Sequence, residues 1–392
     1  MLTSFAYIFL AGIALGYLAQ KLSLPSLVGM LIAGFLIGPY ALDLISFKVL
    51  DISTELRQIA LIIILMRAGL ALKFSELKRA GLPALLICFI PAIFEIGAMV
   101  IFAPRILGIS ILDAAIMGAV VAAVSPAVIV PKMLRLMDEK AGTKKSIPQM
   151  IMAGASVDDI FVITLFTAFT ALAQGGEVST GSFVEIPISI LLGIALGSSA
   201  GYLLSRYFKA FHMRDSIKLL IMISFSALFL QLEHLLAGIV SVSGLLAIMT
   251  MGVTILQIHP TLARRISPKF NKLWVGAEIM LFVLVGASID INYALDAGAN
   301  VVILILAVML VRMIGVYCCM IGSTLNNRER LFCMIAYLPK ATVQAAIGSL
   351  PLSMGLPCGK IVLTVAVVAI IISAPLGAFG IEASYKYLLK ES

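Results

Sequence analysis

Long runs of hydrophobic residues, separated by short polar segments, fill almost the whole chain. A helix needs about 20 apolar residues to cross the roughly 30 Å hydrocarbon core of a bilayer, because it rises about 1.5 Å per residue. Thirteen segments reach or approach this length, and the pattern therefore predicts an all-α polytopic membrane protein. The segments cover residues 2–20, 25–46, 57–73, 82–104, 110–133, 148–172, 185–206, 216–232, 235–257, 272–289, 299–322, 331–350 and 361–383.

The positions of the basic residues support this count. Of the 28 Lys and Arg residues, 21 lie in or beside the loops that follow the odd-numbered segments, or in the C-terminal tail. They include Lys73, Lys78 and Arg79 after the third segment, Arg264, Arg265, Lys269 and Lys272 after the ninth, and Lys390 in the tail. Because basic loops stay in the cytoplasm, we expect the N-terminus outside and the C-terminus in the cytoplasm. No basic residue precedes the first segment, which favours a true span over a cleaved signal peptide.

The composition agrees with a membrane protein. Hydrophobic residues make up 61% of the chain and charged residues 12%, against about 45–50% and about 25% in soluble domains. This excludes disorder, nucleic-acid binding and a secreted disulfide scaffold as main interpretations, and the net charge of +8 reflects the basic loops. The five cysteines form no CxxC pair. Without an ATP-binding motif, a hydrolase motif or an appended nucleotide-binding domain, we expect neither an enzyme nor a bound cofactor.

Two adjacent carboxyl groups, those of Asp158 and Asp159, lie near the middle of the sixth segment. An ionised side chain at the centre of a span costs at least about 2.5–3.5 kcal/mol, so the pair needs a reason. Neighbours on a helix point about 100° apart, so one carboxyl group can face a cavity while the other meets another helix. A buried carboxylate that holds either a proton or a small cation is the simplest exchanger. The alternative is a pair of acids that reach solvent at the membrane surface.

Prolines interrupt two of the apolar segments. Pro126 lies in the stretch AVSPAVIVP of the fifth segment, and Pro339 in the stretch LPKATVQAA of the twelfth, beside Lys340. Proline removes a backbone donor and breaks a helix, and broken backbone inside a membrane is tolerated where protein or a water cavity satisfies it. The freed carbonyl groups can bind a cation, although a kink is as often structural. Because the two segments are seven apart, they suggest inverted repeats.

Four further charges lie within the segments. Glu95 is in the fourth and Arg312 in the eleventh, also seven apart, so we expect these segments to be neighbours and the two side chains to pair. The pair has either a structural role alone, or Arg312 also balances Asp158. Arg67 and Glu278 lie near the cytoplasmic ends of their segments. We interpret Arg67 as a side chain that reaches the surface, and Glu278 as a rim residue or part of a cation funnel.

These features resemble the cation:proton antiporter superfamily, and most closely its sodium/proton exchanger branch called NHA. The resemblance covers nearly the whole chain. It rests on residues 59–72 (IALIIILMRAGLAL), 123–131 (AVSPAVIVP), 155–163 (ASVDDIFVI) and 339–348 (PKATVQAAIG). It implies an elevator-type antiporter of Na⁺ or Li⁺ and H⁺, built from inverted repeats with two broken crossing helices. The chain departs from many relatives at Val124-Ser125-Pro126, where they carry Thr-Asp, and at Arg312, where others carry Lys.

The resemblance also implies a domain division and a set of site residues. A homodimer would form through residues 1–80 and 211–290. The transport core would comprise 81–173 and 291–392, with 174–210 as a linker helix. Asp159 would be the main carrier of the cation and proton. The proposed set is Asp158 and Asp159 as the metal site for Na⁺ or Li⁺, with Ser125 and Val124 as further ligands, Glu95, Arg312 and Lys340 as charge-balancing residues, and Pro126 and Pro339 as the helix-breaking prolines.

Three alternatives stay open at this point. A K⁺/H⁺ antiporter of the same superfamily differs only in the size of the site. A sodium-coupled organic-anion symporter shares the architecture but calls for more polar cavity residues than the chain offers. A channel lacks obligatory proton coupling, and a scaffold without transport gives no reason for the charges within the segments. Because the chain is compact, we expect a bacterial inner (plasma) membrane as its location.

Overall fold

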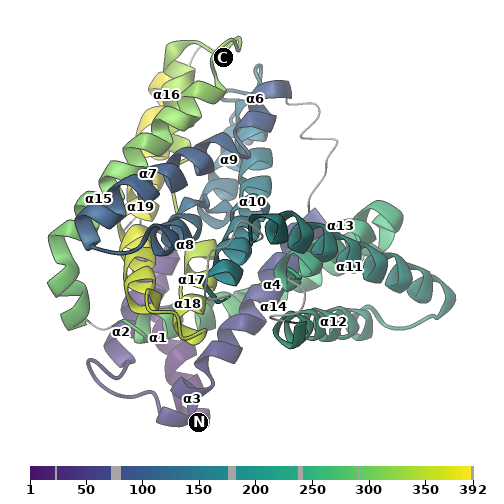
Figure 1. Cartoon of the computed structure of the whole chain (residues 1–392). Coiled ribbons are helices and arrows are strands. Elements are labelled where there is room, and N and C mark those ends of the chain that lie inside the picture. Colours follow the sequence, from purple (N-terminus) through teal and green to yellow (C-terminus); the bar gives the residue numbers. More distant parts are fainter. Residues whose placement is uncertain (23, 72–80, 175–181, 237–241, 290, 390–392) are drawn as a thin grey trace. The chain divides into compact units, whose positions relative to one another are not determined.

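The computed structural model describes residues 1–22, 24–71, 81–174, 182–236, 242–289 and 291–389 (Figure 1). Within these ranges every regular element is helical, and no strand occurs. Nine of the described helical stretches are long and apolar enough to cross a membrane. The all-α class predicted from the hydrophobic pattern is therefore confirmed. Basic residues Lys73, Lys78, Arg79 and Lys390 of the predicted loops lie outside the described residues.

The chain divides into two compact units. The first comprises residues 1–54, 73–162 and 279–392, and the second residues 55–72 and 163–278. The functional division expected above concerns which helices move together, so it stays a prediction. The helices of the first unit are α1 (Leu2–Lys21), α2 (Ser26–Ile37), α3 (Phe47–Asp51), α6 (Gly81–Leu86), α7 (Ile90–Leu107), α8 (Ile111–Ala122), α9 (Pro126–Asp138), α15 (Ile291–Cys319), α16 (Asn327–Ala336), α17 (Thr342–Ile347), α18 (Leu350–Ser353) and α19 (Gly359–Leu388).

The second unit contains α11 (Ser182–Ala210), α12 (Asp215–Leu236) and α13 (Gly244–Ile258). Three longer helices are divided between the units at the residues given above: α4 (Ser53–Ala71), α10 (Ile147–Gln174) and α14 (Pro260–Ala287). Within the second unit α13 packs against both α11 and α12.

Helix boundaries differ from the predicted segments in several places. The basic loop expected around Arg264, Arg265, Lys269 and Lys272 is helical, because α14 begins at Pro260 and continues into the apolar run. Pro260 occupies the first helical position, where its missing N–H is not needed. The second segment is helical only to Ile37, since the backbone extends at Gly38 before Pro39. The fourth is interrupted between α6 and α7. The count of thirteen spans stays a prediction.

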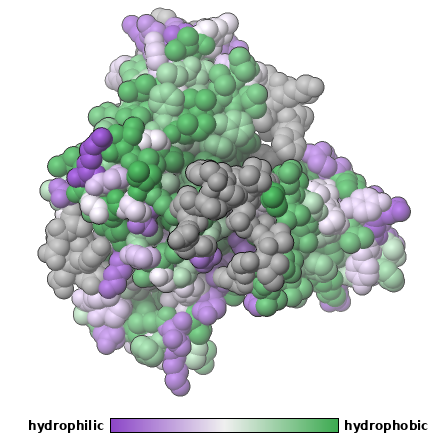
Figure 2. All heavy atoms as spheres, viewed as in Figure 1, coloured by the Kyte–Doolittle hydropathy of each residue, from purple (hydrophilic) through white to green (hydrophobic). Residues whose placement is uncertain are grey.

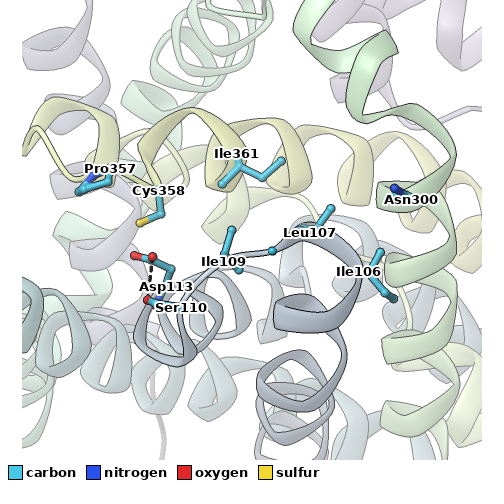
Figure 3. A pocket seen from close by; sticks show the side chains of 10 residues that line it. Ile106, Leu107, Ile109, Ser110, Asp113, Asn300, Pro357, Cys358 and Ile361 are labelled. Atoms are coloured by element: carbon cyan, nitrogen blue, oxygen red, sulfur yellow. Dashed lines mark hydrogen bonds between the residues drawn. The ribbon is translucent and has the colours of Figure 1, made fainter.

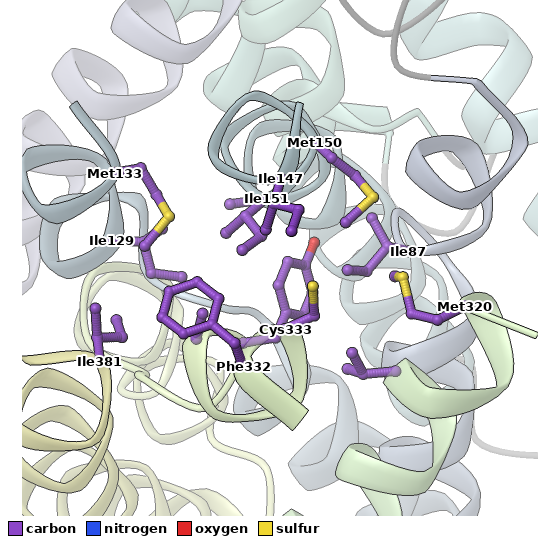
Figure 4. Close-up of a cluster of buried hydrophobic side chains, with 14 of the residues drawn as sticks. Ile87, Ile129, Met133, Ile147, Met150, Ile151, Met320, Phe332, Cys333 and Ile381 are labelled. Atoms are coloured by element: carbon purple, nitrogen blue, oxygen red, sulfur yellow. The ribbon is translucent and has the colours of Figure 1, made fainter. Parts of the chain in front are cut away.

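Apolar side chains are widely exposed, as a bilayer protein requires. Leu10, Leu310 and Ile321 are each more than 60% exposed, and hydrophobic residues cover much of the face in Figure 2. Extended apolar surfaces of this kind mark faces that meet a membrane or another protein. Inside the first unit, α9, α10, α16 and α19 contribute to one hydrophobic cluster, which includes Met133, Ile151 and Phe332 (Figure 4). Tyr337 belongs to the same cluster and connects it to the charged residues described below.

Helices α1 and α2 pack closely through a glycine. A Cβ atom added at Gly29 would lie 2.1 Å from the carbonyl oxygen of Leu15, whereas one added at Gly97 on α7 would meet nothing within 4 Å. We expect Gly29→Ala to lower the free energy of unfolding by about 2 kcal/mol, because the two backbones must separate. The control Gly97→Ala should leave stability unchanged or raise it by about 0.5–1 kcal/mol. Equal unfolding midpoints for the two variants in detergent would contradict this account of the packing.

Candidate functional site

Two interrupted helices meet inside the first unit. Residues 123–125 separate α8 from α9, and Ser125 is in extended backbone just before Pro126. Residues 337–341 separate α16 from α17 and contain Pro339. The backbone N–H of Ser125 donates a 2.8 Å hydrogen bond to the carbonyl of Pro339, so the two breaks lie side by side. The breaks predicted from the two prolines are therefore confirmed.

Helix α7 packs against α15, as the spacing of their segments predicted (Figure 1). This packing brings Glu95 of α7 to Arg312 of α15, with Nη1 of the arginine 2.8 Å from Oε2 of the glutamate. Lys340, in the second break, places its Nζ 2.7 Å from the same oxygen. All three side chains are fully buried. The pairing of Glu95 with Arg312 is thus confirmed, and Lys340 adds a second cation that the sequence did not assign to Glu95.

The guanidinium group of Arg312 binds several groups at once. Its Nη2 lies 3.1 Å from Oδ2 of Asp158. Its Nη1 also donates to the carbonyl of Ala122, and its Nε donates to the carbonyl of Tyr337 at 3.0 Å. The guanidinium carbon of Arg312 lies 5.2 Å from the centroid of the Tyr337 ring, which is a cation–π geometry. Arg312 therefore connects Glu95 and Asp158 to the broken backbone. Its contact with Asp158 is the one that the sequence suggested for a charge-balancing arginine.

The two aspartates on α10 have different surroundings. Asp158 is fully buried, and its Oδ2 accepts a 2.8 Å hydrogen bond from the backbone N–H of Val124 as well as the contact from Arg312. Asp159 is 6% exposed. Among the described residues, neither Oδ1 of Asp158 nor Oδ1 of Asp159 has a hydrogen-bond partner. Each aspartate thus keeps one buried oxygen that can accept a proton or bind a cation.

The carboxyl end of α8 is capped by side chains from other elements. The carbonyl of Val121 accepts from Lys340 Nζ at 2.8 Å and from Gln344 Nε2 at 3.0 Å. The carbonyl of Ala123 accepts from Gln344 Nε2 at 2.7 Å. These carbonyls form the negative end of the helix dipole, so positive charge and amide donors stabilise them. Backbone opened by a proline inside a membrane is thereby satisfied by protein, as that environment demands.

Four polar residues of this crossing lie outside the set of site residues predicted from the sequence. They are Tyr337, Thr342, Gln344 and Ser373, which are all buried or nearly so. Thr342 Oγ1 lies 3.5 Å from Ser125 Oγ, and Ser373 Oγ accepts from the backbone N–H of Lys340 at 3.1 Å. Thr342 and Gln344 are polar residues within an apolar stretch, and that pattern was a usable signal. Tyr337 and Ser373 carry no such signal, because tyrosine and serine are common in membrane-spanning helices.

Arg67 and Glu278 belong to the second unit. The guanidinium of Arg67 lies 5.5 Å from the ring centroid of Trp274, which is a cation–π geometry. The structure therefore gives Arg67 an aromatic partner within its own unit. The interpretations of Glu278 as a rim residue or a funnel residue both stay predictions.

A cavity of about 540 Å³ lies elsewhere in the first unit, between the turn that joins α7 to α8 and the start of α19 (Figure 3). Its acidic residue, Asp113, accepts a 2.7 Å hydrogen bond from Ser110, and the Ser110 hydroxyl in turn caps the backbone N–H of Asp113. Asp113 thus stabilises the first turn of α8. None of the residues lining this cavity belongs to the charged cluster, which comprises Glu95, Asp158, Asp159, Arg312 and Lys340. The charged cluster is the candidate site because its two aspartates each keep a buried oxygen without a hydrogen-bond partner among the described residues.

Comparisons with known proteins agree with this geometry. Residues 5–383 match the family described as sodium/hydrogen exchanger, transmembrane. The chain is 33% identical over 369 residues to the human sodium/hydrogen exchanger 9B2, which covers 91% of this chain and 68% of that protein. It is 31% identical over 371 residues to human sodium/hydrogen exchanger 9B1, which covers 91% and 70%.

A solved structure has the same fold. The sodium proton antiporter MjNhaP1 from Methanocaldococcus jannaschii superposes with a TM-score of 0.83 and 20% identity, covering 100% of this chain and 99% of that one. At this identity the similarity establishes the antiporter fold alone. The family match over residues 5–383 decides which family the chain belongs to. The chain therefore belongs to the sodium/hydrogen exchanger family, whose members are multi-pass membrane transporters that exchange cations for protons and are not enzymes.

Proposed function

We propose that this chain exchanges Na⁺ or Li⁺ for H⁺, with Asp159 as the group that carries either ion. The supporting observation is the charge balance of the buried cluster. Arg312 pairs with Glu95 and Asp158, and Lys340 pairs with Glu95. Among the described members of this cluster, Asp159 alone has no ion pair. With three carboxylates and two basic groups ionised, the cluster carries one net negative charge, which one monovalent cation or one proton neutralises.

The proposed ligands are hard oxygen atoms, which suit small cations. Asp159 supplies the first, and its buried Oδ1 accepts no hydrogen bond from the described residues. Asp158 supplies a second through its own Oδ1. The Ser125 hydroxyl is buried and lies 3.5 Å from the Thr342 hydroxyl, which is a long contact. The carbonyl of Val124, in the first break, completes the set proposed from the sequence.

We propose an elevator-type movement, and the cost of burying charge limits which states of the site can cross. A net charge in a low-dielectric environment is expensive, whereas a neutral site crosses more easily. The core would therefore cross the membrane with either a cation or a proton on Asp159, and rarely with an unoccupied carboxylate. Glu95 is already paired with Arg312 and Lys340, and Asp158 with Arg312. The site therefore exchanges only one charge. We infer an exchange of one cation for one proton.

We also propose the arrangement that the family resemblance implies. The chain would work as a homodimer through residues 1–80 and 211–290, with 81–173 and 291–392 as the moving core and 174–210 as the linker. Its N-terminus would lie outside and its C-terminus in the cytoplasm of a bacterial inner membrane, since basic loops stay on the cytoplasmic side. Chemical cross-linking in the membrane tests the homodimer. The accessibility of introduced cysteines on either side of the membrane tests the orientation of the termini.

Reconstitution tests the exchange itself. Purified protein is placed in liposomes that contain a pH-sensitive dye, a proton gradient is imposed, and the membrane potential is clamped. We expect NaCl or LiCl to collapse the gradient and choline chloride to leave it intact. A response to KCl alone would make the protein a K⁺/H⁺ antiporter, and cation flux without proton movement would make it a channel. No response to any cation between pH 6 and 9 would contradict antiport and direct attention to organic anions.

Competition for one carboxyl group predicts a pH dependence. A proton on Asp159 excludes the cation, so the Na⁺ concentration that gives half-maximal exchange should rise as the pH falls. Once most of the sites are protonated, the expected rise is about tenfold for each unit of pH. Initial rates at several Na⁺ concentrations and pH values check this. A half-maximal concentration that stays constant while only the maximal rate changes would show that the two ions do not compete.

A further inference from the structure

The side chain of Gln344 lies at the crossing of the broken helices and is not among the proposed ligands of the cation. It is 1% exposed, and its Nε2 donates hydrogen bonds to the carbonyls of Val121 and Ala123. Carbonyl oxygens only accept, so these contacts fix which end of the amide is nitrogen. Val121 also accepts from Lys340. The carbonyl of Ala123 is therefore the one that depends on Gln344.

The carbonyl of Ala123 and the N–H of Val124 belong to a single peptide group. That N–H donates to Oδ2 of Asp158 at 2.8 Å, while the carbonyl accepts from Gln344 at 2.7 Å. In a planar trans peptide the two groups point in opposite directions. Gln344 and Asp158 therefore hold opposite edges of the same peptide plane. Loss of either contact would allow this plane to turn.

The following peptide group is held as well. The N–H of Ser125 donates to the carbonyl of Pro339 at 2.8 Å. The other edge of that plane is the carbonyl of Val124, which is one of the proposed cation ligands. With both planes that flank Val124 fixed, the direction of its carbonyl is fixed too. The orientation of the backbone ligand thus depends on two contacts, one from Pro339 in the second break and one from Gln344 on α17, the helix that follows it.

We propose that Gln344 is a positioning residue for cation binding. It holds the Ala123–Val124 peptide so that Asp158 and the Val124 carbonyl are oriented before the cation arrives. This inference rests on the proposed function. Ligands that are already in place bind more tightly, because no ordering cost is incurred on binding. The chain of dipoles from the Gln344 amide through the peptide to the Asp158 carboxylate also strengthens each of its hydrogen bonds.

The test replaces Gln344 by methionine, which is similar in length but has no donor. In the liposome assay Gln344→Met should raise the half-maximal Na⁺ concentration about tenfold, equivalent to about 1.4 kcal/mol. The maximal rate should stay within about twofold of the wild-type rate. The matched control is Gln149→Met, which makes the same change on α10 at a half-buried glutamine outside the crossing. It should leave both values unchanged.

An unchanged half-maximal Na⁺ concentration in Gln344→Met would overturn this role, whether or not the maximal rate falls. A purely structural residue would lower the maximal rate alone. If Gln344→Met does not purify as folded protein, Gln344→Asn decides the matter. Its amide is one methylene shorter and cannot reach both carbonyls, so the same rise is expected. A wild-type protein that exchanges no cation would instead refute the proposed function, independently of either glutamine variant.

Discussion

Asp159→Asn is expected to abolish cation/proton exchange while the protein still folds and inserts. Asparagine keeps the size of the side chain but carries no charge and takes up no proton, so the site cannot alternate between its two occupants. Because Asp159 has no ion pair among the described members of the cluster, its replacement leaves the pairs of Glu95, Arg312 and Lys340 in place. We expect an unchanged unfolding temperature in detergent and an exchange rate reduced at least about a hundredfold, measured in the liposome assay.

The matched control for this variant is Asp113→Asn. Asp113 stabilises the first turn of α8 and lines the cavity in Figure 3, outside the charged cluster. Its replacement should cost no more than about 1 kcal/mol of stability and should preserve exchange. Exchange that survives in Asp159→Asn, or that is lost equally in both variants, would remove Asp159 from the role of carrier.

Arg312→Met is expected to have the largest effect on stability. The variant removes the guanidinium that contacts Glu95, Asp158 and two backbone carbonyls, all inside the protein. Asp158 is then left as a buried charge without an ionic partner. Breaking a buried ion pair from one side costs about 3–5 kcal/mol, because the remaining charge is uncompensated. We expect a loss of this size in the free energy of unfolding, measured by denaturation in detergent.

Two further variants separate charge from geometry at this position. Arg312→Lys keeps the positive charge but replaces the planar fork by a single ammonium group, so it should recover only part of the stability. Arg105→Met removes an exposed arginine near the end of α7, whose guanidinium donates to the carbonyl of Ile101, and should cost less than about 0.5 kcal/mol. A stability of Arg312→Met within about 1 kcal/mol of wild type would mean that the acids are balanced by other groups.

The sequence was sufficient to predict the broken helices and one of the ion pairs. A proline in an apolar segment has a direct local consequence, so Pro126 and Pro339 located both breaks. The pairing of Glu95 with Arg312 followed from the seven-segment spacing and from the cost of an unpaired buried charge. Asp158 and Asp159 were identified because carboxyl groups are rare within spans. In each case either local chemistry or a strong energetic penalty restricted the possible structures.

The remaining contacts depend on how the two breaks cross. Lys340 could have met either aspartate, and only the three-dimensional crossing directs it to Glu95 and the carbonyl of Val121. The capping of Ala123 by Gln344 has no local signature for the same reason. The basic segment from Pro260 onward is helical although its charge predicts a loop, because Lys and Arg are good helix formers.

The most direct test of the central claim is the number of protons released when the purified protein binds Na⁺ or Li⁺. Calorimetric titrations in two buffers with different ionisation enthalpies give this number without any transport step. At a pH low enough for the site to be protonated, we predict the release of close to one proton per bound cation, and none in Asp159→Asn. Cation binding without proton release, or the same release from the Asp159→Asn variant, would contradict exchange at a single shared carboxyl group.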